Sequence, residues 1–221
     1  MRQLIGRDNV MIDSLRDFLP IALESRIGHE LGLTDGQDWR PFAVLTLHRP
    51  SNVDSLETLS ALLGAIDAIA ADVPVIFPVH PRTQQRLVQA GIVHHPQLRL
   101  IPPIGYLDFL CLLSKAMLVL TDSGGIQEET TALGVPCLTL RENTERPVTV
   151  SQGTNLLVGT DPRNIMAAAG DILAGKRKAG RVPPLWDGKA AERIVEILIA
   201  RSSEAGGRGG ARGRPGSPPP G

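Results

Sequence analysis

The stretch Thr121-Asp-Ser-Gly-Gly-Ile-Gln-Glu-Glu129 decides how this 221-residue chain folds. It follows the apolar run 117–120 and leads into Thr130-Thr-Ala-Leu-Gly134. An apolar run, a glycine turn and a following amphipathic segment predict a buried strand that turns directly into a helix. Such a turn aims free backbone N–H groups and the positive end of the helix at an anion, usually a phosphate.

Four residues of this turn are candidate ligand contacts. Gly124 and Gly125 would let a phosphate approach the backbone closely, and Ser123 could add a hydroxyl donor. Glu129 lies six residues after Ser123 and could accept hydrogen bonds from a ribose diol. The same pattern is typical of a turn that only closes a strand onto a helix, with Ser123 as its N-cap. The turn therefore predicts a nucleotide or nucleotide-sugar site, with a purely structural role as the alternative.

Strands and helices alternate on both sides of this turn. We expect strands over 42–47, 75–79, 98–101, 117–121, 136–140 and 155–158, and helices over 56–71, 83–90, 106–116, 125–133, 147–152 and 165–174. Apolar strands separated by helices indicate a parallel sheet covered on both faces. The predicted fold class is therefore α/β, a Rossmann-like doubly wound domain.

The flanking segments complete the predicted domain organisation. Residues 1–40 form an N-terminal helix, over 10–25 with a kink at Pro20, and a linker. The main domain spans 41–203 and ends in a helix over 189–200 whose apolar side chains need a partner surface. Residues 204–221 are a Gly/Pro/Arg tail that we expect to be disordered.

Composition narrows the function classes. Lys plus Arg and Asp plus Glu both total 23, so a net charge of zero argues against a dominant nucleic-acid or membrane-surface role. Cys111 and Cys137 lie in apolar segments and are expected to be buried free thiols. No metal-ligand spacing, signal core or long uncharged apolar run is found, so the default expectation is a soluble cytoplasmic protein without a metal.

Several candidate side chains follow the ends of predicted strands, where ligands of open parallel sheets bind. His48 could act as a general acid or base, or as a cation against a pyrophosphate, and Arg49 could pair with a phosphate bidentately. His80 and Arg82 could add basic groups to the same cleft. Each histidine could instead simply cap or pack a loop. Arg146 precedes Pro147, which suits a helix start, so Arg146 should face the cleft unless a neighbouring glutamate takes it.

A series of motifs resembles the non-hydrolysing UDP-N-acetylglucosamine 2-epimerases. In family order these are Leu45-Thr-Leu-His-Arg-Pro-Ser-Asn-Val-Asp54, Phe77-Pro-Val-His-Pro-Arg-Thr83, Gly105-Tyr-Leu-Asp-Phe109, the 122–129 turn, Arg141-Glu-Asn-Thr-Glu-Arg-Pro147, Gly153-Thr-Asn155 and Asp187-Gly-Lys-Ala-Ala-Glu-Arg-Ile194. Together they cover about residues 9–198. The resemblance implies the C-terminal domain of a glycosyltransferase-B-type fold, whose N-terminal domain would normally precede the segment Asn9–Leu15.

The resemblance also implies an activity and roles for the candidate residues. The family interconverts UDP-N-acetylglucosamine and UDP-N-acetylmannosamine by eliminating and re-adding UDP, and needs no metal or redox cofactor. Ser123, Gly124, Gly125 and Arg146 would hold the diphosphate, Glu129 the ribose, and His48 the phosphate or the sugar. Phe109 would lie beside the uracil, although a core position fits it equally well, and Ile104 replaces a polar residue of some members.

What the resemblance leaves open follows from the apparent absence of the N-terminal domain. The family's carboxylates that move the C2 proton lie in that domain, which would have to act in cis or in trans. Arg49, His80 and Arg82 would face the interdomain region, where a regulatory UDP-sugar is thought to bind. The alternatives are a non-catalytic UDP-sugar-binding fragment or split subunit, a hydrolysing epimerase, and a glycosyltransferase of the same fold. A homodimer is a further expectation.

Overall fold

The computed structural model describes residues 9–207, which form an α/β domain around one six-stranded parallel sheet. The strand order is β5-β4-β3-β6-β7-β8. Their bounds are β3 (Ala43–Thr46), β4 (Val75–Pro78), β5 (Leu98–Ile101), β6 (Leu118–Thr121), β7 (Cys137–Thr139) and β8 (Asn155–Leu157). All six strands were predicted from their apolar runs, and so was the doubly wound topology.

The strand order reverses between β3 and β6. From β3 the chain adds β4 and β5 outward on one side, then crosses back to place β6 against the other edge of β3. The two strands end in register at Thr46 and Thr121, whose hydroxyl oxygens lie 2.7 Å apart. In open parallel sheets, the crevice at such a reversal is where ligands bind.

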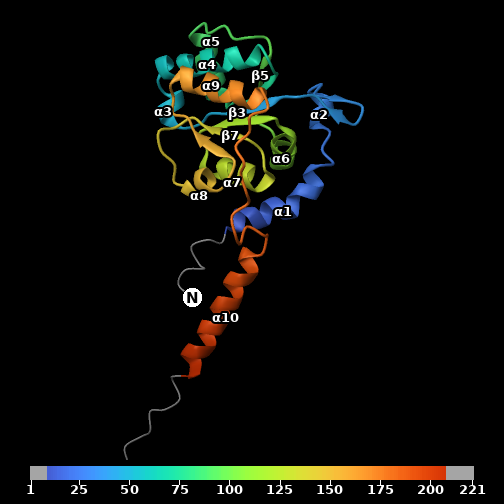
Figure 1. The fold of residues 1–221 in the computed structure, drawn as a ribbon, viewed down its shortest axis with the longest axis vertical. Helices are drawn as coiled ribbons and strands as arrows, with labels where there is room; N and C mark the ends of the chain where they lie inside the picture. Colours follow the sequence, from blue (N-terminus) through green and yellow to red (C-terminus); the bar gives the residue numbers. More distant parts are fainter. Residues whose placement is uncertain (1–8, 208–221) are drawn as a thin grey trace, which may run out of the picture.

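Helices cover both faces of the sheet, as Figure 1 shows. On one face, α4 (Leu56–Ala70) packs against α9 (Pro162–Leu173), and on the other lie α6 (Tyr106–Lys115) and α7 (Gly124–Leu133). Aliphatic side chains fill both cores, and a third small cluster joins α1 (Val10–Ala22) to α6. The shorter elements are α2 (Ile27–Glu30), β1 (Thr34–Asp35), β2 (Asp38–Trp39), α3 (Pro50–Val53), α5 (Pro81–Gln89) and α8 (Pro147–Ser151).

The two flanking helices differ in extent from the sequence prediction. Helix α1 continues through Pro20 and ends at Ala22, three residues before the predicted end. Helix α10 (Ala190–Gly207) extends beyond the predicted residue 200, so residues 204–207 of the predicted tail are helical and 208–221 lie outside the described residues. The antiparallel pair β1–β2 was not predicted, because two strands of two residues carry no periodic signal.

Helix α10 is attached to the domain mainly at its first turn. The buried carboxylate of Asp13 accepts hydrogen bonds from the backbone N–H groups of Ala190 (3.1 Å) and Ala191 (2.7 Å), as an N-cap supplied by another helix. Arg16 donates to the Trp186 carbonyl from Nε (3.2 Å) and Nη2 (3.0 Å). Beyond this clasp, α10 extends away from the domain (Figure 1), with Leu198 61% exposed.

The two cysteines were predicted to lie in the interior. Cys111 and Cys137 are both free and buried, as expected, and burial raises the pKa of the Cys137 thiol to about 12.

Among residues 9–207, no helix combines the length and the apolar character that a membrane crossing requires.

Candidate functional site

The site is built around Asp122, which directly follows β6 and is completely buried. Its carboxylate accepts hydrogen bonds from the backbone N–H groups of His48 (3.1 and 3.2 Å) and Arg49 (2.9 Å). It also accepts one from the side-chain amide of buried Asn52 at 3.1 Å. All three donors belong to the segment after β3, so Asp122 ties that segment across the reversal of strand order.

The imidazole of His48 is the fourth partner of Asp122. Its Nδ1 lies 2.7 Å from Oδ1 of the carboxylate. Because an ionised carboxylate can only accept, Nδ1 must carry the hydrogen, and Nε2 is left as the free ring nitrogen. The His48 side chain is 61% exposed, so this free nitrogen is accessible at the switch point of the sheet.

The predicted anion-binding turn forms the start of α7. Ser123 is the N-cap residue in extended conformation, its N–H donates to Thr121 Oγ1 (3.0 Å), and its own hydroxyl makes no capping hydrogen bond. The N–H groups of Gly124 and Gly125 belong to the first turn, where no intrahelical acceptor exists. A helix N-terminus with a free hydroxyl therefore lies beside His48, as the anion-site interpretation requires.

The two glycines have different surroundings. A Cβ atom on Gly124 would be 3.8 Å from the Arg146 side chain, which is ordinary contact. A Cβ atom on Gly125 would lie 2.9 Å from the methyl carbon of Met11 in α1. Gly124 thus leaves space between the turn and Arg146, whereas Gly125 is also needed for the packing of α1 against α7.

Arg146 is the N-cap residue of α8 and is brought to α7 by an ion pair. Its Nε lies 3.0 Å from Oε1 of Glu128, whose side chain is only 8% exposed. Burial raises the pKa of the Glu128 carboxyl, and the charge of Arg146 opposes that rise. The Arg146 side chain is 43% exposed, so it can meet a ligand from this position.

A cavity of about 510 Å³ opens beside this ion pair. It is bounded by the start of α1, the α7–α8 region and the segment before α10. The residues that line it are Asn9, Met11, Glu128, Glu145, Arg146, Pro147, Val148, Gln152, Pro183, Pro184 and Trp186. Of the predicted ligand contacts it includes only Arg146, so the cavity adjoins the turn at Ser123 without containing it.

Glu129 lies one residue further along α7 and is 7% exposed. One of its carboxylate oxygens accepts a hydrogen bond of 3.3 Å from the hydroxyl of Tyr106, at the start of α6. Burial raises the pKa of Glu129, and burial together with the Glu129 charge raises the pKa of Tyr106 to about 12. Tyr106 was not predicted as a site residue, although it stands in the Gly105–Phe109 motif.

Phe109 is half-buried and packs with α6 against the core between the sheet and that helix, together with Ile104. This is the position that the core interpretation of Phe109 requires. A place beside a base stays a prediction, since no contact in the described part of the chain tests it.

The basic residues after β4 are arranged differently from those after β3. His80 is the N-cap of α5, and its Nδ1 accepts a hydrogen bond of 3.3 Å from the N–H of Arg82. The capping alternative is therefore realised at His80. The side chains of His80 and Arg82 are exposed.

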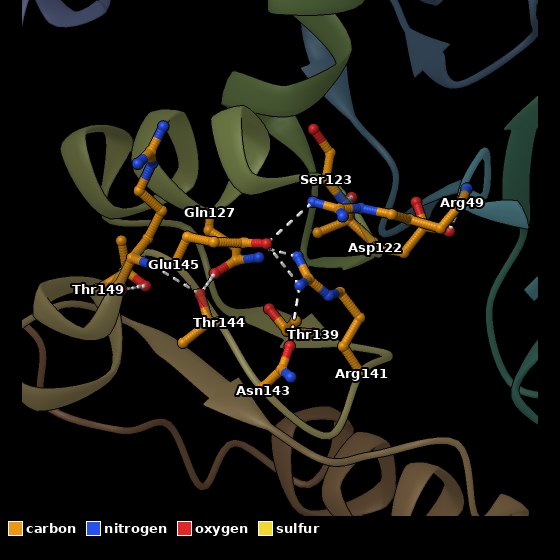
Figure 2. A network of polar contacts seen from close by, with 12 residues as sticks. Arg49, Asp122, Ser123, Gln127, Thr139, Arg141, Asn143, Thr144, Glu145 and Thr149 are labelled. Carbon is orange, nitrogen blue, oxygen red and sulfur yellow. Dashed lines mark hydrogen bonds and ion pairs between the residues drawn. The ribbon is translucent and has the colours of Figure 1, made fainter. Parts of the chain in front are cut away.

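Arg49 points toward the segment after β7 instead. Figure 2 shows Arg49 and Arg141 converging on Glu145. Arg141 makes two hydrogen bonds of 2.8 Å to the carboxylate, and Arg49 Nη2 lies 3.5 Å from it. These bonds, chiefly those from Arg141, lower the pKa of Glu145 to about 2. The predicted phosphate-facing role of Arg49 therefore competes with an internal partner.

A buried amide network beneath this segment was not predicted from the sequence. Gln127 Oε1 accepts from Thr144 Oγ1 (2.6 Å) and from Asn155 Nδ2 (3.2 Å), and both amides are fully buried. Thr144 Oγ1 in turn accepts from the Arg146 N–H at 2.9 Å, as Figure 2 shows in part. Asn155 also accepts from Thr139 in β7 and donates to Thr149 in α8, so the network links two strands and two helices and fixes the loop that carries Arg146. Their presence in the 122–129 and 153–155 motifs was the only available signal.

Metal ligation has no support in this part of the chain. Within residues 9–207, no group of three or more His, Cys, Asp or Glu side chains is placed to hold a metal ion. The site consists of a helix N-terminus, two arginines, one exposed imidazole and buried carboxylates, which together suit an anionic ligand with hydroxyl groups.

Comparison with known proteins connects this arrangement to one family. The family model for UDP-N-acetylglucosamine 2-epimerase matches residues 5–199. UDP-N-acetylglucosamine 2-epimerases of Methanococcus maripaludis and Methanocaldococcus jannaschii are 42% and 44% identical over 72% and 71% of this chain. The alignments cover 44% of each relative, so the chain spans about half the length of the curated relatives it matches.

Solved structures give the same result. The M. jannaschii UDP-GlcNAc 2-epimerase in complex with UDP-GlcNAc and UDP superposes with a TM-score of 0.75 at 38% identity, over 88% of this chain and 54% of that one. The Neisseria meningitidis UDP-GlcNAc 2-epimerase bound to UDP-GlcNAc gives a TM-score of 0.74 at 27% identity, with 88% and 54% covered. The sequence motifs, the doubly wound sheet and these matches together show that the chain belongs to the UDP-N-acetylglucosamine 2-epimerase family.

Proposed function

We propose that this chain supplies the UDP-binding part of an enzyme that interconverts UDP-N-acetylglucosamine and UDP-N-acetylmannosamine. The observation that carries the proposal is the convergence of the α7 N-terminus, Arg146 and His48 at the reversal of strand order. Relatives of the same fold have been solved with UDP-GlcNAc and UDP bound. As a UDP-sugar enzyme, the protein is also proposed to be cytoplasmic.

Each proposed contact uses a group that the site leaves available. Ser123 and the first N–H groups of α7 would hold one phosphate, and Arg146 the other side of the diphosphate. Glu129 would accept hydrogen bonds from the ribose diol through the oxygen that Tyr106 does not occupy. Phe109 would lie beside the uracil. No resident metal or cofactor is part of the proposal.

The chemistry that these residues would assist is the loss of UDP. The proton leaves C2 of the sugar, and the C1–O bond breaks with its electron pair staying on the β-phosphate oxygen. Re-addition of the phosphate to C1, with the proton returning to the opposite face of C2, completes the epimerisation. Donors fixed around the departing phosphate stabilise its growing negative charge and so lower the barrier to cleavage. We assign no residue of the described part of the chain to the C2 proton.

Two further aspects of the proposal concern other parts of the assembly. The carboxylates that move the C2 proton would come from a second domain, in cis or in trans, and two copies would form a homodimer. Arg49, His80 and Arg82 would line the interdomain region and contact a regulatory UDP-sugar. For Arg49 this requires exchange of Glu145 for the incoming phosphate.

The reaction has close rivals that product analysis separates. A hydrolysing relative would release UDP and free N-acetylmannosamine, and a glycosyltransferase would need an acceptor. A 34% identical relative from Pseudomonas aeruginosa is a UDP-2,3-diacetamido-2,3-dideoxy-D-glucuronate 2-epimerase, which epimerises a different sugar. A binding module without catalysis would bind UDP and turn over none of these substrates.

Proton NMR of the protein with UDP-N-acetylglucosamine in deuterated water tests the proposal. Deuterium at C2 together with UDP-N-acetylmannosamine is the expected result for the complete enzyme. For this chain alone we expect no exchange, but line broadening of the uridine signals that added UDP removes. Exchange by the chain alone would place the proton-transfer groups within it and contradict our assignment. Absence of broadening would contradict UDP binding.

A further inference from the structure

We propose that Asp122 is a positioning residue that holds the His48 imidazole in its Nδ1–H tautomer, with Nε2 directed to the anion site. The identity of the anion, the diphosphate of a UDP-sugar, rests on the proposed function. The tautomer itself does not, because it follows from contacts within the chain.

The first argument is the one-sidedness of the contacts to Asp122. In the described part of the chain, every hydrogen-bond donor to its carboxylate comes from the segment after β3: two backbone N–H groups, the Asn52 amide and the His48 ring. Asn52 Nδ2 also donates to the carbonyl of Leu140, after β7, at 3.1 Å. The carboxylate therefore fixes the backbone and the ring of one segment together, relative to the ends of two neighbouring strands.

The second argument is that the carboxylate does not need the ring to be satisfied. Without the imidazole, Asp122 would keep its backbone donors and the Asn52 amide, which is sufficient for a buried carboxylate. The exposed ring, in contrast, has Asp122 as its only recorded partner in the described part of the chain. The contact between His48 and Asp122 therefore serves to orient the ring more than to satisfy the buried carboxylate.

The third argument concerns what the fixed tautomer does at an anion site. When the ring is protonated, Nε2–H can donate to a phosphate oxygen, with Nδ1–H still bound to Asp122. When the ring is neutral, Asp122 keeps the hydrogen on Nδ1, and Nε2 presents a lone pair that repels the phosphate. Binding of the diphosphate should therefore depend on the orientation in which Asp122 holds the ring, so loss of either the imidazole or the carboxylate should weaken it.

The charged groups around the ring come from three segments. Arg49 lies beside it in the same segment, Asp122 faces it from the end of β6, and Glu145 and Arg141 pair with each other after β7. Of the charged side chains within residues 9–207, Asp122 is the one bonded to the ring. The contribution of the ring to binding should therefore follow Asp122, while Arg49, Arg141 and Glu145 contribute a background that a substitution of Asp122 leaves in place.

The direct test is long-range proton–nitrogen NMR of the histidine rings in the full chain without ligand. The His48 signals are identified by their loss in His48→Gln. At a pH where the ring is neutral, we expect the hydrogen on Nδ1 in the wild type and predominantly on Nε2 in Asp122→Asn. Asp13→Asn is the matched control, because Asp13 is also a buried acceptor of two backbone N–H groups, and it should leave the tautomer unchanged. A wild-type ring with the hydrogen on Nε2 would overturn the proposal without any variant.

Affinity for UDP-N-acetylglucosamine, measured by calorimetry at one pH in the wild type and the variants, tests the consequence. We expect His48→Gln and Asp122→Asn each to weaken binding by about ten-fold, since a charge-assisted hydrogen bond is lost in both. Asp13→Asn should change the affinity by less than about three-fold. Wild-type affinity retained in Asp122→Asn would overturn the positioning role, whereas failure of the wild type to bind would refute the proposed function and leave the tautomer result standing.

Discussion

The segments after β3 and β4 begin alike and end differently. Each places a histidine two residues after the end of a strand, and each histidine precedes a helix that begins with proline, at Pro50 and Pro81. At His48, however, Nδ1 donates to a buried carboxylate, whereas at His80 the same atom accepts from the backbone of α5. The difference lies in the neighbouring strands: β3 adjoins β6, which leads into Asp122, and β4 adjoins β3 and β5. A histidine at a strand end therefore acquires its role from the strand beside it.

Removing the carboxylate should have the largest effect on this difference. We expect Asp122→Ala to lower the free energy of unfolding by about 3–5 kcal/mol, because three N–H donors, including the buried Asn52 amide, lose their acceptor. Urea denaturation followed by circular dichroism measures the loss. His48→Ala is the control, since it leaves those donors paired, and it should cost less than about 1 kcal/mol. Equal losses in the two variants would show that Asp122 stabilises the protein through its contact with the His48 ring and not through its hydrogen bonds to the backbone.

Ligand affinity should distinguish the two histidines next. His48→Gln is expected to weaken UDP binding by roughly 10- to 100-fold, which is the loss of one hydrogen bond between charged partners. His80→Gln, whose ring is engaged at α5, should change the affinity by less than about two-fold. Calorimetric titration of UDP into each variant at pH 6 provides the comparison. A similar loss for both would place His80 in the same site and erase the distinction.

The cap at His80 predicts a smaller effect on stability. His80→Ala should lower the free energy of unfolding by about 1 kcal/mol, the usual contribution of an N-cap side chain. His80→Asn should restore it, because asparagine is among the best N-cap residues. The measurement is again urea denaturation. If the asparagine variant were as unstable as the alanine variant, the imidazole would have to stabilise the protein in another way.

The smallest effect concerns Glu145, which is bound chiefly by Arg141 and more weakly by Arg49 of the segment after β3. The pKa of Glu145 is lowered from 4.5 to about 2, so its stabilising contribution is complete above about pH 4.5 and is lost as the pH falls toward 2. The difference in unfolding free energy between wild type and Glu145→Gln should therefore shrink over this interval. Asp161 and Asp187 also have lowered pKa values, but both remain in the variant and cancel in the difference. A difference that is independent of pH would show that the bonds from Arg141 do not depend on the charge of Glu145.

The sequence was sufficient for the strands and for the place of the site. Apolar runs and glycine turns carry their own local signal, and the carboxyl ends of parallel strands must share one edge. It was not sufficient for pairings between side chains. Glu128 and Glu129 are consecutive in the sequence, yet one pairs with Arg146 and the other with Tyr106, because successive residues on a helix face directions about 100° apart.

Asp122 illustrates the same limit at the centre of the site. It stands in the turn after β6, whose sequence pattern predicts an anion site through its glycines, its serine and its acidic pair. The role of Asp122 depends on the register of β3 against β6 and on an asparagine 70 positions earlier in the chain. Such long-range geometry has no local periodicity from which it could be predicted.

The contacts of Asp13 and Arg16 at the start of α10, the clasp described above, attach the helix near one end, so a small rotation there would be amplified at the other end. With 18 residues at about 1.5 Å each, it is roughly 27 Å long, and Asp13 and Arg16 hold only its base. A rotation of about 10° at the clasp would displace the far end by roughly 5 Å, on the scale of one helical turn. A small change in how α1 packs against Gly125, in the turn after β6, would therefore produce a large displacement at the far end of α10.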